Sequence, residues 1–129
     1  MAPRSQITWR TSARHGRGVF ATGALSANTI VERAPAIVAD GHDKVRPYLF
    51  VSDRGLAHES PGAASGFVLV LGLMSLCNHS AQPNAEVALL VDEGAGLLAV
   101  LTTTVMIAAN QELVIHYPDV DYYREHGLA

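Results

Sequence analysis

The stretch Cys77-Asn78-His79-Ser80-Ala81-Gln82-Pro83-Asn84 decides the fold, and it follows the longest apolar run of the chain. Its polar side chains come directly after a segment that we expect to be buried, so each of them must find a hydrogen-bond partner. A bound polar ligand would supply such partners, and a capping turn is the alternative. Cys77 and His79 are two residues apart, a spacing that disfavours a nucleophilic Cys–His pair, so we expect a buried, inert thiol.

A second unusual stretch is Arg14-His15-Gly16-Arg17-Gly18-Val19-Phe20, in which a Gly-x-Gly precedes an apolar run. Two glycines in this arrangement let the backbone come close to a ligand and present its N–H and C=O groups. The same pattern is typical of an ordinary tight turn. It therefore indicates a binding strip only in combination with other motifs.

A third stretch, Glu112-Leu113-Val114-Ile115-His116-Tyr117, is predicted to form a strand over residues 113–117. Alternation along a strand places Leu113, Ile115 and Tyr117 on one face and the two residues between them on the other. Tyr117 then closes an apolar face with a hydroxyl group. This suits a core tyrosine with one hydrogen bond, and it also suits a reacting group.

The chain has 129 residues, 49% of them hydrophobic, with a net charge of −3 and a single cysteine. This length is typical of one domain, so we expect one unit over residues 1–129. One thiol excludes a disulfide within the monomer and indicates a reducing, intracellular compartment. A metal site is not expected, because Cys77 has no second cysteine and no His-x-x-x-His pair occurs.

The charge pattern and the apolar runs also bear on partners. The nine basic residues are scattered, so no stripe is predicted for a nucleic-acid backbone. The apolar runs are shorter than the roughly 20 residues that a membrane helix needs, so no membrane is expected. The N-terminus lacks the apolar stretch of a signal peptide. A mildly acidic surface is compatible with a basic partner.

Short apolar or β-branched runs separated by turn residues predict a mainly β fold with short helices. We expect strands over residues 7–10, 18–22, 30–34, 36–39, 85–91, 97–103 and 113–117. Turn residues at 92–96 predict that the flanking runs pair as a hairpin. Residues 44–53 could form one or two helical turns after Pro47, and the run 68–76 fits a helix or a strand equally. Residues 55–66 are predicted to be an irregular surface insertion.

Three blocks of the chain together resemble the SET-domain protein lysine methyltransferases in order and spacing. They are Gly16-Arg17-Gly18-Val19-Phe20-Ala21, Asn78-His79-Ser80 with Pro83-Asn84, and Glu112-Leu113-Val114-Ile115-His116-Tyr117. The resemblance runs from about residue 7 to residue 123, and Tyr48-Leu49-Phe50 is similar to a segment of the minimal, stand-alone viral members. It implies one β-clip-like SET domain of small curved sheets, whose C-terminal strand passes beneath an earlier loop as a pseudoknot. No pre-SET or zinc-binding post-SET domain is expected.

The resemblance also implies a reaction, the transfer of a methyl group from S-adenosyl-L-methionine to a lysine of a basic protein such as a histone-like tail. It assigns cofactor binding to His15, Gly16, Arg17, Gly18, Asn78, His79 and Tyr117. Asn78 resembles the residue that binds the cofactor's amino group, and His79 the one whose main chain meets the adenine. Tyr117 also resembles the catalytic tyrosine, while Tyr48, Tyr122 and Tyr123 resemble walls of the substrate channel. No metal is implied.

Departures from the family pattern keep other functions open. Asn110-Gln111 stands where the family usually has Gly-Glu, and Pro118 follows Tyr117 where Gly is usual. Proline fixes φ and removes an N–H, so the turn behind Tyr117 can differ. A catalytically impaired, SET-like peptide-binding module is therefore the alternative, and a β-rich small-ligand domain is a third candidate. We expect the bound substrate to be covered either by the C-terminal tail or by a second copy of the chain in a homodimer.

Overall fold

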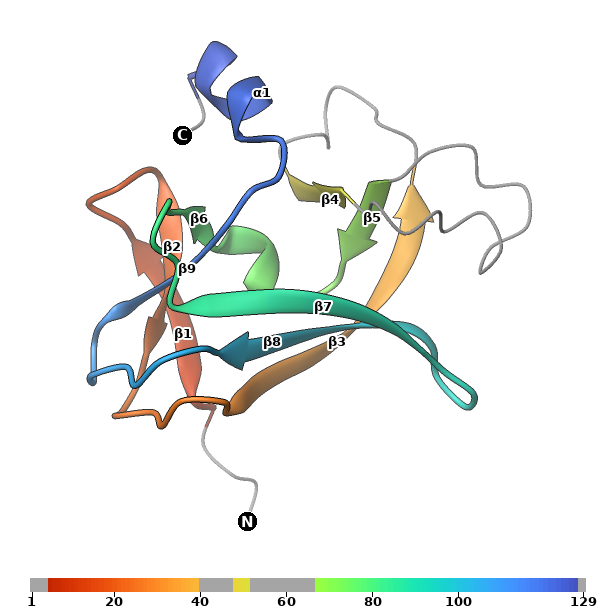
Figure 1. The fold of residues 1–129 in the computed structure, drawn as a ribbon, viewed down its shortest axis with the longest axis horizontal. Coiled ribbons are helices and arrows are strands. Elements are labelled where there is room, and N and C mark those ends of the chain that lie inside the picture. The colour runs from red at the N-terminus through yellow and green to blue at the C-terminus, as the bar shows by residue number, and fades with distance from the viewer. Residues whose placement is uncertain (1–4, 40–47, 52–66, 128–129) are drawn as a thin grey trace.

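The computed structural model describes residues 5–39, 48–51 and 67–127, and its strands form two sheets (Figure 1). In chain order the elements are β1 (Ile7–Thr11), β2 (Arg17–Ala21), β3 (Ile30–Ala39), β4 (Leu49–Val51), β5 (Phe67–Val70), the 3-10 helix η3 (Leu73–Leu76), β6 (Asn78–His79), β7 (Ala85–Asp92), β8 (Gly96–Thr103), β9 (Glu112–Ile115) and α1 (Val120–Glu125). The four-stranded sheet has the order β1-β2-β9-β6, and the five-stranded sheet has the order β4-β5-β3-β8-β7. The predicted mainly β fold of small, curved sheets is confirmed.

The predicted hairpin around residues 92–96 is the β7–β8 pair, in which Asp92 stands opposite Gly96. The Asp92 side chain accepts hydrogen bonds from the backbone N–H groups of Gly94 and Ala95, at 3.0 and 2.8 Å. Gly96 has a φ of +79°, a left-handed conformation that favours glycine. The turn residues therefore set the register of β7 and β8.

Residues 30–39 form one strand, so the prediction of two strands separated at Pro35 is wrong. β3 pairs with β8 up to Pro35, which stands opposite Leu98, and with β5 from Ala36 onward. Pro35 thus lies where the strand changes partner, and its carbonyl accepts a hydrogen bond from Leu71 N at 2.9 Å. A proline is tolerated in a strand where no ladder hydrogen bond needs its missing N–H.

Two segments that the sequence left uncertain are now assigned in part. The run 68–76 is divided between the end of β5 and η3, so it is a strand followed by a 3-10 turn. The helical turns predicted within 44–53 are wrong for residues 49–51, which form β4 and pair with β5. Residues 44–47, 52 and 53, and the predicted insertion at 55–66, lie outside the described residues.

The C-terminal strand β9 is held by the segment that the sequence singled out. β6 pairs with β9 in parallel, and the connection that follows β6 crosses β9 (Figure 1). Asn84 fixes this crossing, because its Nδ2 donates to Glu112 O at 2.9 Å and its Oδ1 accepts from Val114 N at 2.8 Å. β9 ends at Ile115, two residues before the predicted end at Tyr117, since the Tyr117 N–H bonds a side chain instead of a strand.

One hydrophobic core joins the two sheets. Its fully buried side chains come from both sheets and from the segments between them, and include Val19, Val68, Met74, Leu101, Ile107 and Leu113. Met74 belongs to η3, so the short helix contributes a side chain to this core. No helix among the described residues is long and apolar enough to cross a bilayer.

Candidate functional site

Two cavities meet around Tyr117. The larger has a volume of about 480 Å³ and the smaller about 290 Å³. Residues that line both of them are Tyr48, Ser75, Tyr117 and Tyr123. The larger cavity is further lined by His15, Gly16, Arg17, Leu76 and Asn78. The first and second sequence motifs and Tyr117 of the third therefore come together in space, although Asn78 is 63 and 61 positions from His15 and Arg17 in the chain.

The turn between β1 and β2 forms one wall of the larger cavity. Gly16 has a φ of +49°, which favours glycine, and its carbonyl accepts a hydrogen bond from Ser12 N at 2.8 Å. Gly18 lies behind this wall, outside the described lining of the cavity. A Cβ atom at Gly18 would collide with the Glu112 carboxylate and come within 3.1 Å of Asn78 Nδ2. Gly18 therefore permits close packing behind the wall.

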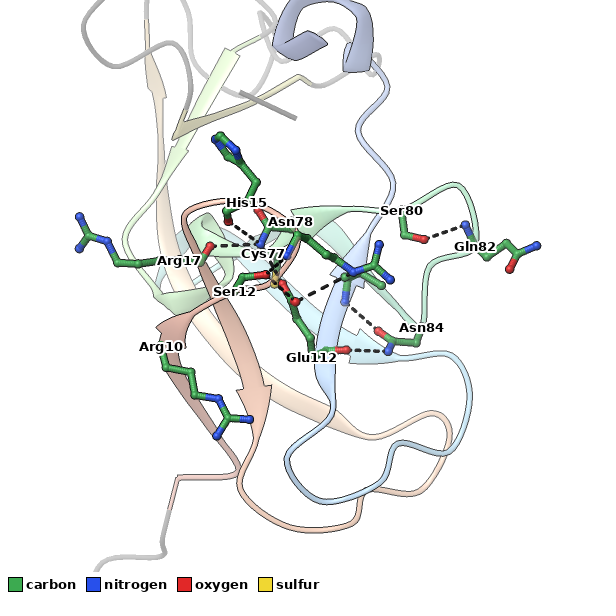
Figure 2. Close-up of polar contacts among 12 residues, drawn as sticks. Arg10, Ser12, His15, Arg17, Cys77, Asn78, Ser80, Gln82, Asn84 and Glu112 are labelled. Atoms are coloured by element: carbon green, nitrogen blue, oxygen red, sulfur yellow. Dashed lines mark hydrogen bonds and ion pairs between the residues drawn. The ribbon is translucent and has the colours of Figure 1, made fainter. Parts of the chain in front are cut away.

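The Glu112 carboxylate ties three segments of the site together (Figure 2). Its Oε2 accepts a hydrogen bond from Asn78 Nδ2 at 2.8 Å, and its Oε1 accepts one from Ser12 Oγ at 2.7 Å. Arg14 Nε lies 4.0 Å from the same Oε1. A single side chain of β9 thus fixes the β1–β2 turn against β6.

Asn78 is buried and uses its amide nitrogen within the protein. Besides Glu112, its Nδ2 donates to the carbonyl oxygens of His15 and Arg17, at 3.1 and 3.2 Å. No donor to its Oδ1 is found among the described residues. An amide oxygen in the cavity lining is an acceptor that suits the ammonium group of a ligand.

Tyr117 lines both cavities, and its hydroxyl donates a hydrogen bond to the carbonyl oxygen of Cys77. Burial, followed by the neighbouring Tyr123, raises the pKa of Tyr117 far above its usual value. The hydroxyl therefore stays protonated at physiological pH, with oxygen lone pairs left to accept further contacts. The Cys77 thiol is buried, and burial raises its pKa as well, which agrees with an inert thiol.

His79 contacts both the backbone and the ring of Tyr117. Its Nδ1 accepts a hydrogen bond from the backbone N–H of Tyr117 at 2.9 Å, and the two rings lie 5.3 Å apart. Burial, followed by the nearby His116, Arg124 and Arg14, lowers the pKa of His79. The neutral imidazole is thus the form that matches its role as an acceptor. Its side chain lies outside the described lining of both cavities.

The predicted aromatic wall is only partly formed by the residues assigned to it. Tyr123 is buried, with its ring 4.6 Å from the Tyr117 ring, and its hydroxyl donates to Leu49 O at 3.3 Å. Tyr48 is 49% exposed and lines both cavities. Tyr122 packs edge-on against Tyr123 and lies outside the described lining. Tyr48 and Tyr123 therefore line the cavities together with Tyr117, whereas Tyr122 packs against Tyr123.

The residues of the larger cavity fit S-adenosylmethionine. Its volume lies within the roughly 300–1,000 Å³ typical of sites for small ligands and cofactors. The Asn78 Oδ1 supplies an acceptor for an amino group, and the turn at Gly16 brings backbone to the cavity wall. Among the described residues, no three side chains are grouped as metal ligands would be.

Sequence reasoning missed several residues that build the site. In the sequence Glu112 is marked only as the first residue of a strand motif, although in the structure it joins Ser12 and Asn78. Ser75 and Leu76 lie in the apolar run before Asn78, and η3 brings them to the cavity. Ser75, a polar residue within that apolar run, was the one sequence feature that could have indicated their role in the site. Nothing local marked Glu112, because its partners are 34 and 100 residues away.

Comparisons with known proteins agree with this arrangement. The family model of the SET domain matches residues 16–118. The crystal structure of a Plasmodium falciparum protein described as a candidate histone methyltransferase is similar, with a TM-score of 0.70 and 24% sequence identity. The similarity covers 91% of this chain and 96% of that chain, and at this identity it shows the fold. No curated protein sequence matches the chain. Because the family model spans most of its length, the chain belongs to the SET-domain family.

Proposed function

We infer that the protein is an S-adenosylmethionine-dependent protein lysine N-methyltransferase. The observation that carries this proposal is the position of Tyr117, whose side chain lines both the cavity that fits the cofactor and the adjoining smaller cavity. A methyl transfer needs donor and acceptor to approach from opposite directions along one line. Two cavities that share a tyrosine provide separate entries for the two reactants.

The bound cofactor would supply an electrophilic methyl group on a sulfonium sulfur. In this proposal the wall at His15, Gly16 and Arg17 and the Asn78 Oδ1 hold the amino-acid part of the cofactor. The Glu112 carboxylate acts indirectly, because it holds Asn78 and Ser12 in place. In this proposal Gly18 and His79 act indirectly. Gly18 allows close packing behind the cavity wall, and His79 holds the backbone of Tyr117.

The target lysine must arrive as a neutral amine, because an ammonium group has no lone pair. Tyr48, Tyr117 and Tyr123 present aromatic rings at the junction of the cavities. Burial in such a channel beside a cationic cofactor lowers the pKa of a lysine, since desolvation and like charge both disfavour the ammonium form. The rings also attract a methylated, cationic product nitrogen by cation–π interaction.

Tyr117 is assigned an orienting role and not that of a base. Its raised pKa keeps the proton on the hydroxyl, which donates to Cys77 O. The phenolic oxygen can then accept weak C–H contacts from a polarised methyl group and align it. The proton of the lysine ammonium leaves to solvent before transfer.

The proposed substrate is a basic protein or tail, such as a histone-like protein. The chain carries a net charge of −3, and Glu86 and Asp119 line the smaller cavity. The structural neighbour from Plasmodium falciparum is itself described as a candidate histone methyltransferase. Acidic groups at the mouth of a groove favour a basic partner.

Two measurements test the proposal. Calorimetric titration with S-adenosylmethionine should show binding, and incubation with methyl-labelled cofactor and a panel of basic proteins, histones included, should label a lysine. Asn78→Asp, which replaces the amide donor beside the Glu112 carboxylate, should weaken cofactor binding, whereas Gln82→Ala on the exposed connection after β6 should not. Cofactor binding without label transfer would instead support the peptide-binding module, and no cofactor binding would contradict both.

A further inference from the structure

The N-terminal part of the chain is basic, in contrast to the rest. Residues 1–31 contain four arginines and no Asp or Glu, whereas all twelve acidic residues lie at position 32 or beyond. Along the whole chain the basic residues look scattered, which predicts no stripe for nucleic acid. The β1–β2 hairpin nevertheless carries Arg10, Arg14 and Arg17, which are three of the five Lys and Arg residues that the structure describes.

β1 is an edge strand that is exposed on both faces. It stands first in the order β1-β2-β9-β6, and its residues 8–11 are all exposed (Figure 1). Successive side chains of a strand point to opposite faces, so Trp9 and Arg10 project on opposite sides of this edge. Trp9 is 52% exposed. Residues 8–11 together with Arg14 and Arg17 therefore form a ridge, which we call the β1 ridge.

Two arginines of the β1 ridge are held by aromatic rings. The Cζ atom of Arg10 lies 4.0 Å from the centre of the Phe20 ring, and that of Arg17 lies 5.7 Å from the centre of the Trp9 ring. Arg10 also donates one N–H to Asn110 O at 2.9 Å. A guanidinium group has five N–H donors, so most of them stay available. Because its fork is rigid and already oriented, such an arginine loses little freedom when it binds an anion.

The charge of the β1 ridge is little neutralised by the described part of the chain. There, the single carboxylate in ion-pair range of the three arginines is Glu112, which lies 4.0 Å from Arg14 Nε. The Arg14 side chain is still 52% exposed. Arg17 points away from the contacts between Asn78 and Glu112 (Figure 2). The ridge is therefore a positive surface on a chain whose net charge is −3.

We propose that the β1 ridge binds the phosphodiester backbone of a nucleic acid. Arginine matches the geometry of phosphate oxygens with paired N–H donors, and threonine hydroxyls, present at positions 8 and 11, also bond them. Trp9 offers a ring on which an unpaired base can stack. An anionic membrane would also attract arginines, but Trp9 is the one large apolar side chain of the ridge. Insertion would therefore bury little apolar surface.

The two cavities of the site carry opposite charges in a way that gives this contact a use. The turn of the hairpin, with His15 and Arg17, lines the larger cavity, whereas Glu86 and Asp119 line the smaller one. A basic protein bound to nucleic acid could present a lysine to the acidic side while its nucleic acid contacts the basic side. This use rests on the proposed function. The binding itself does not, because it involves neither cofactor nor lysine.

Fluorescence anisotropy of the unmodified protein tests the binding. The probes are a labelled 20-nucleotide single strand and the duplex of the same sequence. If the three arginines neutralise three phosphates, raising the salt concentration from 50 to 200 mM should weaken duplex binding roughly 40-fold and single-strand binding roughly 20-fold. Trp9→Ala distinguishes the two sources of phosphodiester. A roughly tenfold loss for the single strand alone assigns the ridge to unpaired strands, and an unchanged affinity for both assigns it to the backbone alone.

Charge variants provide the matching test on the protein. Arg10→Gln removes one cation, so it should weaken binding roughly fivefold at 50 mM salt and reduce the slope of log affinity against log salt by about 0.7–0.9. Thr8→Glu adds a carboxylate to the same strand and keeps both stacked arginines, and should weaken binding similarly. Arg33→Gln on β3 is the control, because it makes the same charge change outside the ridge. It should alter affinity by less than twofold, and melting temperatures show whether each variant is folded.

The outcomes separate this inference from the proposed function. No binding of either nucleic acid at 50 mM salt would overturn it, and so would equal affinities for Arg10→Gln, Thr8→Glu and Arg33→Gln. Binding to phosphatidylserine vesicles that is lost in Arg10→Gln, without binding to nucleic acid, would assign the ridge to a membrane and overturn it too. Absence of label transfer by the unmodified protein would contradict the methyltransferase alone, since the anisotropy assay needs neither methyl donor nor lysine.

Discussion

The Tyr117 hydroxyl is the single group on which the proposed chemistry depends most. Tyr117→Phe keeps the ring against Tyr123 and His79 but removes the oxygen that bonds Cys77 O. If this oxygen aligns the methyl group in the transition state, turnover should fall by about 10²–10³-fold, as when one preorganised polar contact is lost. Cofactor affinity, measured by calorimetry, should change much less.

The matched control for this variant is Tyr122→Phe, because Tyr122 lies outside the described lining of both cavities. It should retain turnover. A core tyrosine with no chemical role would behave differently at position 117: the free energy of unfolding would fall by about 1 kcal/mol, and the folded protein would turn over normally. That result would remove Tyr117 from the reaction.

His79 makes the backbone of Tyr117 sensitive to pH. Its folded pKa is lowered, so it contributes stability that is complete above the ordinary value of about 6.5 and is lost as pH falls from there toward the folded pKa. In that window the unfolded chain takes up the proton first. A proton on Nδ1 would also abolish the acceptor for the Tyr117 N–H. We therefore expect both stability and turnover to fall below pH 6.5.

Two variants isolate this contribution. His79→Asn retains a side-chain acceptor but cannot titrate, so the part of the acid-side loss due to His79 should disappear from urea-unfolding curves measured between pH 5 and pH 7. His116→Asn removes a neighbour that lowers the pKa of His79. It should therefore narrow the pH range over which the stability from His79 is lost. Identical pH profiles for His79→Asn and the unmodified protein would refute this account.

At the scale of elements, η3 depends on a carboxylate from another strand. Glu32 on β3 accepts hydrogen bonds from the backbone N–H groups of Leu73 and Met74, at 2.9 and 2.8 Å. The helix has no side-chain cap of its own. Free N–H groups at a helix start need such acceptors, and charged ones form the stronger bonds. Glu32 therefore positions the segment that carries Ser75 and Leu76 to the larger cavity.

Glu32→Ala should lower the free energy of unfolding by about 2–4 kcal/mol, because two partly buried N–H groups lose their acceptor. Glu32→Gln keeps one acceptor oxygen and should lose about half as much. Urea denaturation measures both. If the alanine and glutamine variants were equally stable, the hydrogen bonds to η3 would not be what Glu32 contributes.

At the scale of the whole molecule, the crossing of β9 by the connection after β6 joins the segments that form the larger cavity. Glu112 on β9 bonds Asn78 on β6. Asn84, in the connection after β6, bonds the backbone of β9 at Glu112 and Val114. Ser80 N also donates to Ile115 O at 2.9 Å. The two sides of the site are therefore joined by a contact between residues that are about 30 positions apart in the chain.

Asn84→Ala should release this clamp. The Val114 N–H and the Glu112 carbonyl would both lose a partner, so the free energy of unfolding should fall by about 2–4 kcal/mol, and cofactor affinity should fall with it because Glu112 is displaced. Gln82→Ala, on the exposed part of the same connection, is the control and should change neither. A destabilised Asn84→Ala protein with unchanged cofactor affinity would show that the clamp does not position Glu112.

The sequence by itself determined features that depend on neighbouring residues. Turn residues at 92–96 predicted the β7–β8 hairpin, because a turn sets the register of the strands beside it. Short apolar or β-branched runs separated by turn residues predicted β1, β2, β7 and β8 to within one residue at each end. The three motifs, read together, identified the family that the comparison with the SET-domain model shows. The turn and the strand runs are signals within about ten residues, and the resemblance adds only the order and spacing of three short motifs.

Only the tertiary structure decided how distant residues combine. It joined β3 across Pro35, because two different partners share the strand on either side of the proline. It placed Glu112 between Ser12 and Asn78, separated Tyr122 from the cavity lining, and left β1 as an exposed edge strand. Such contacts depend on packing between segments far apart in the chain, so a local pattern of residue types carries no information about them.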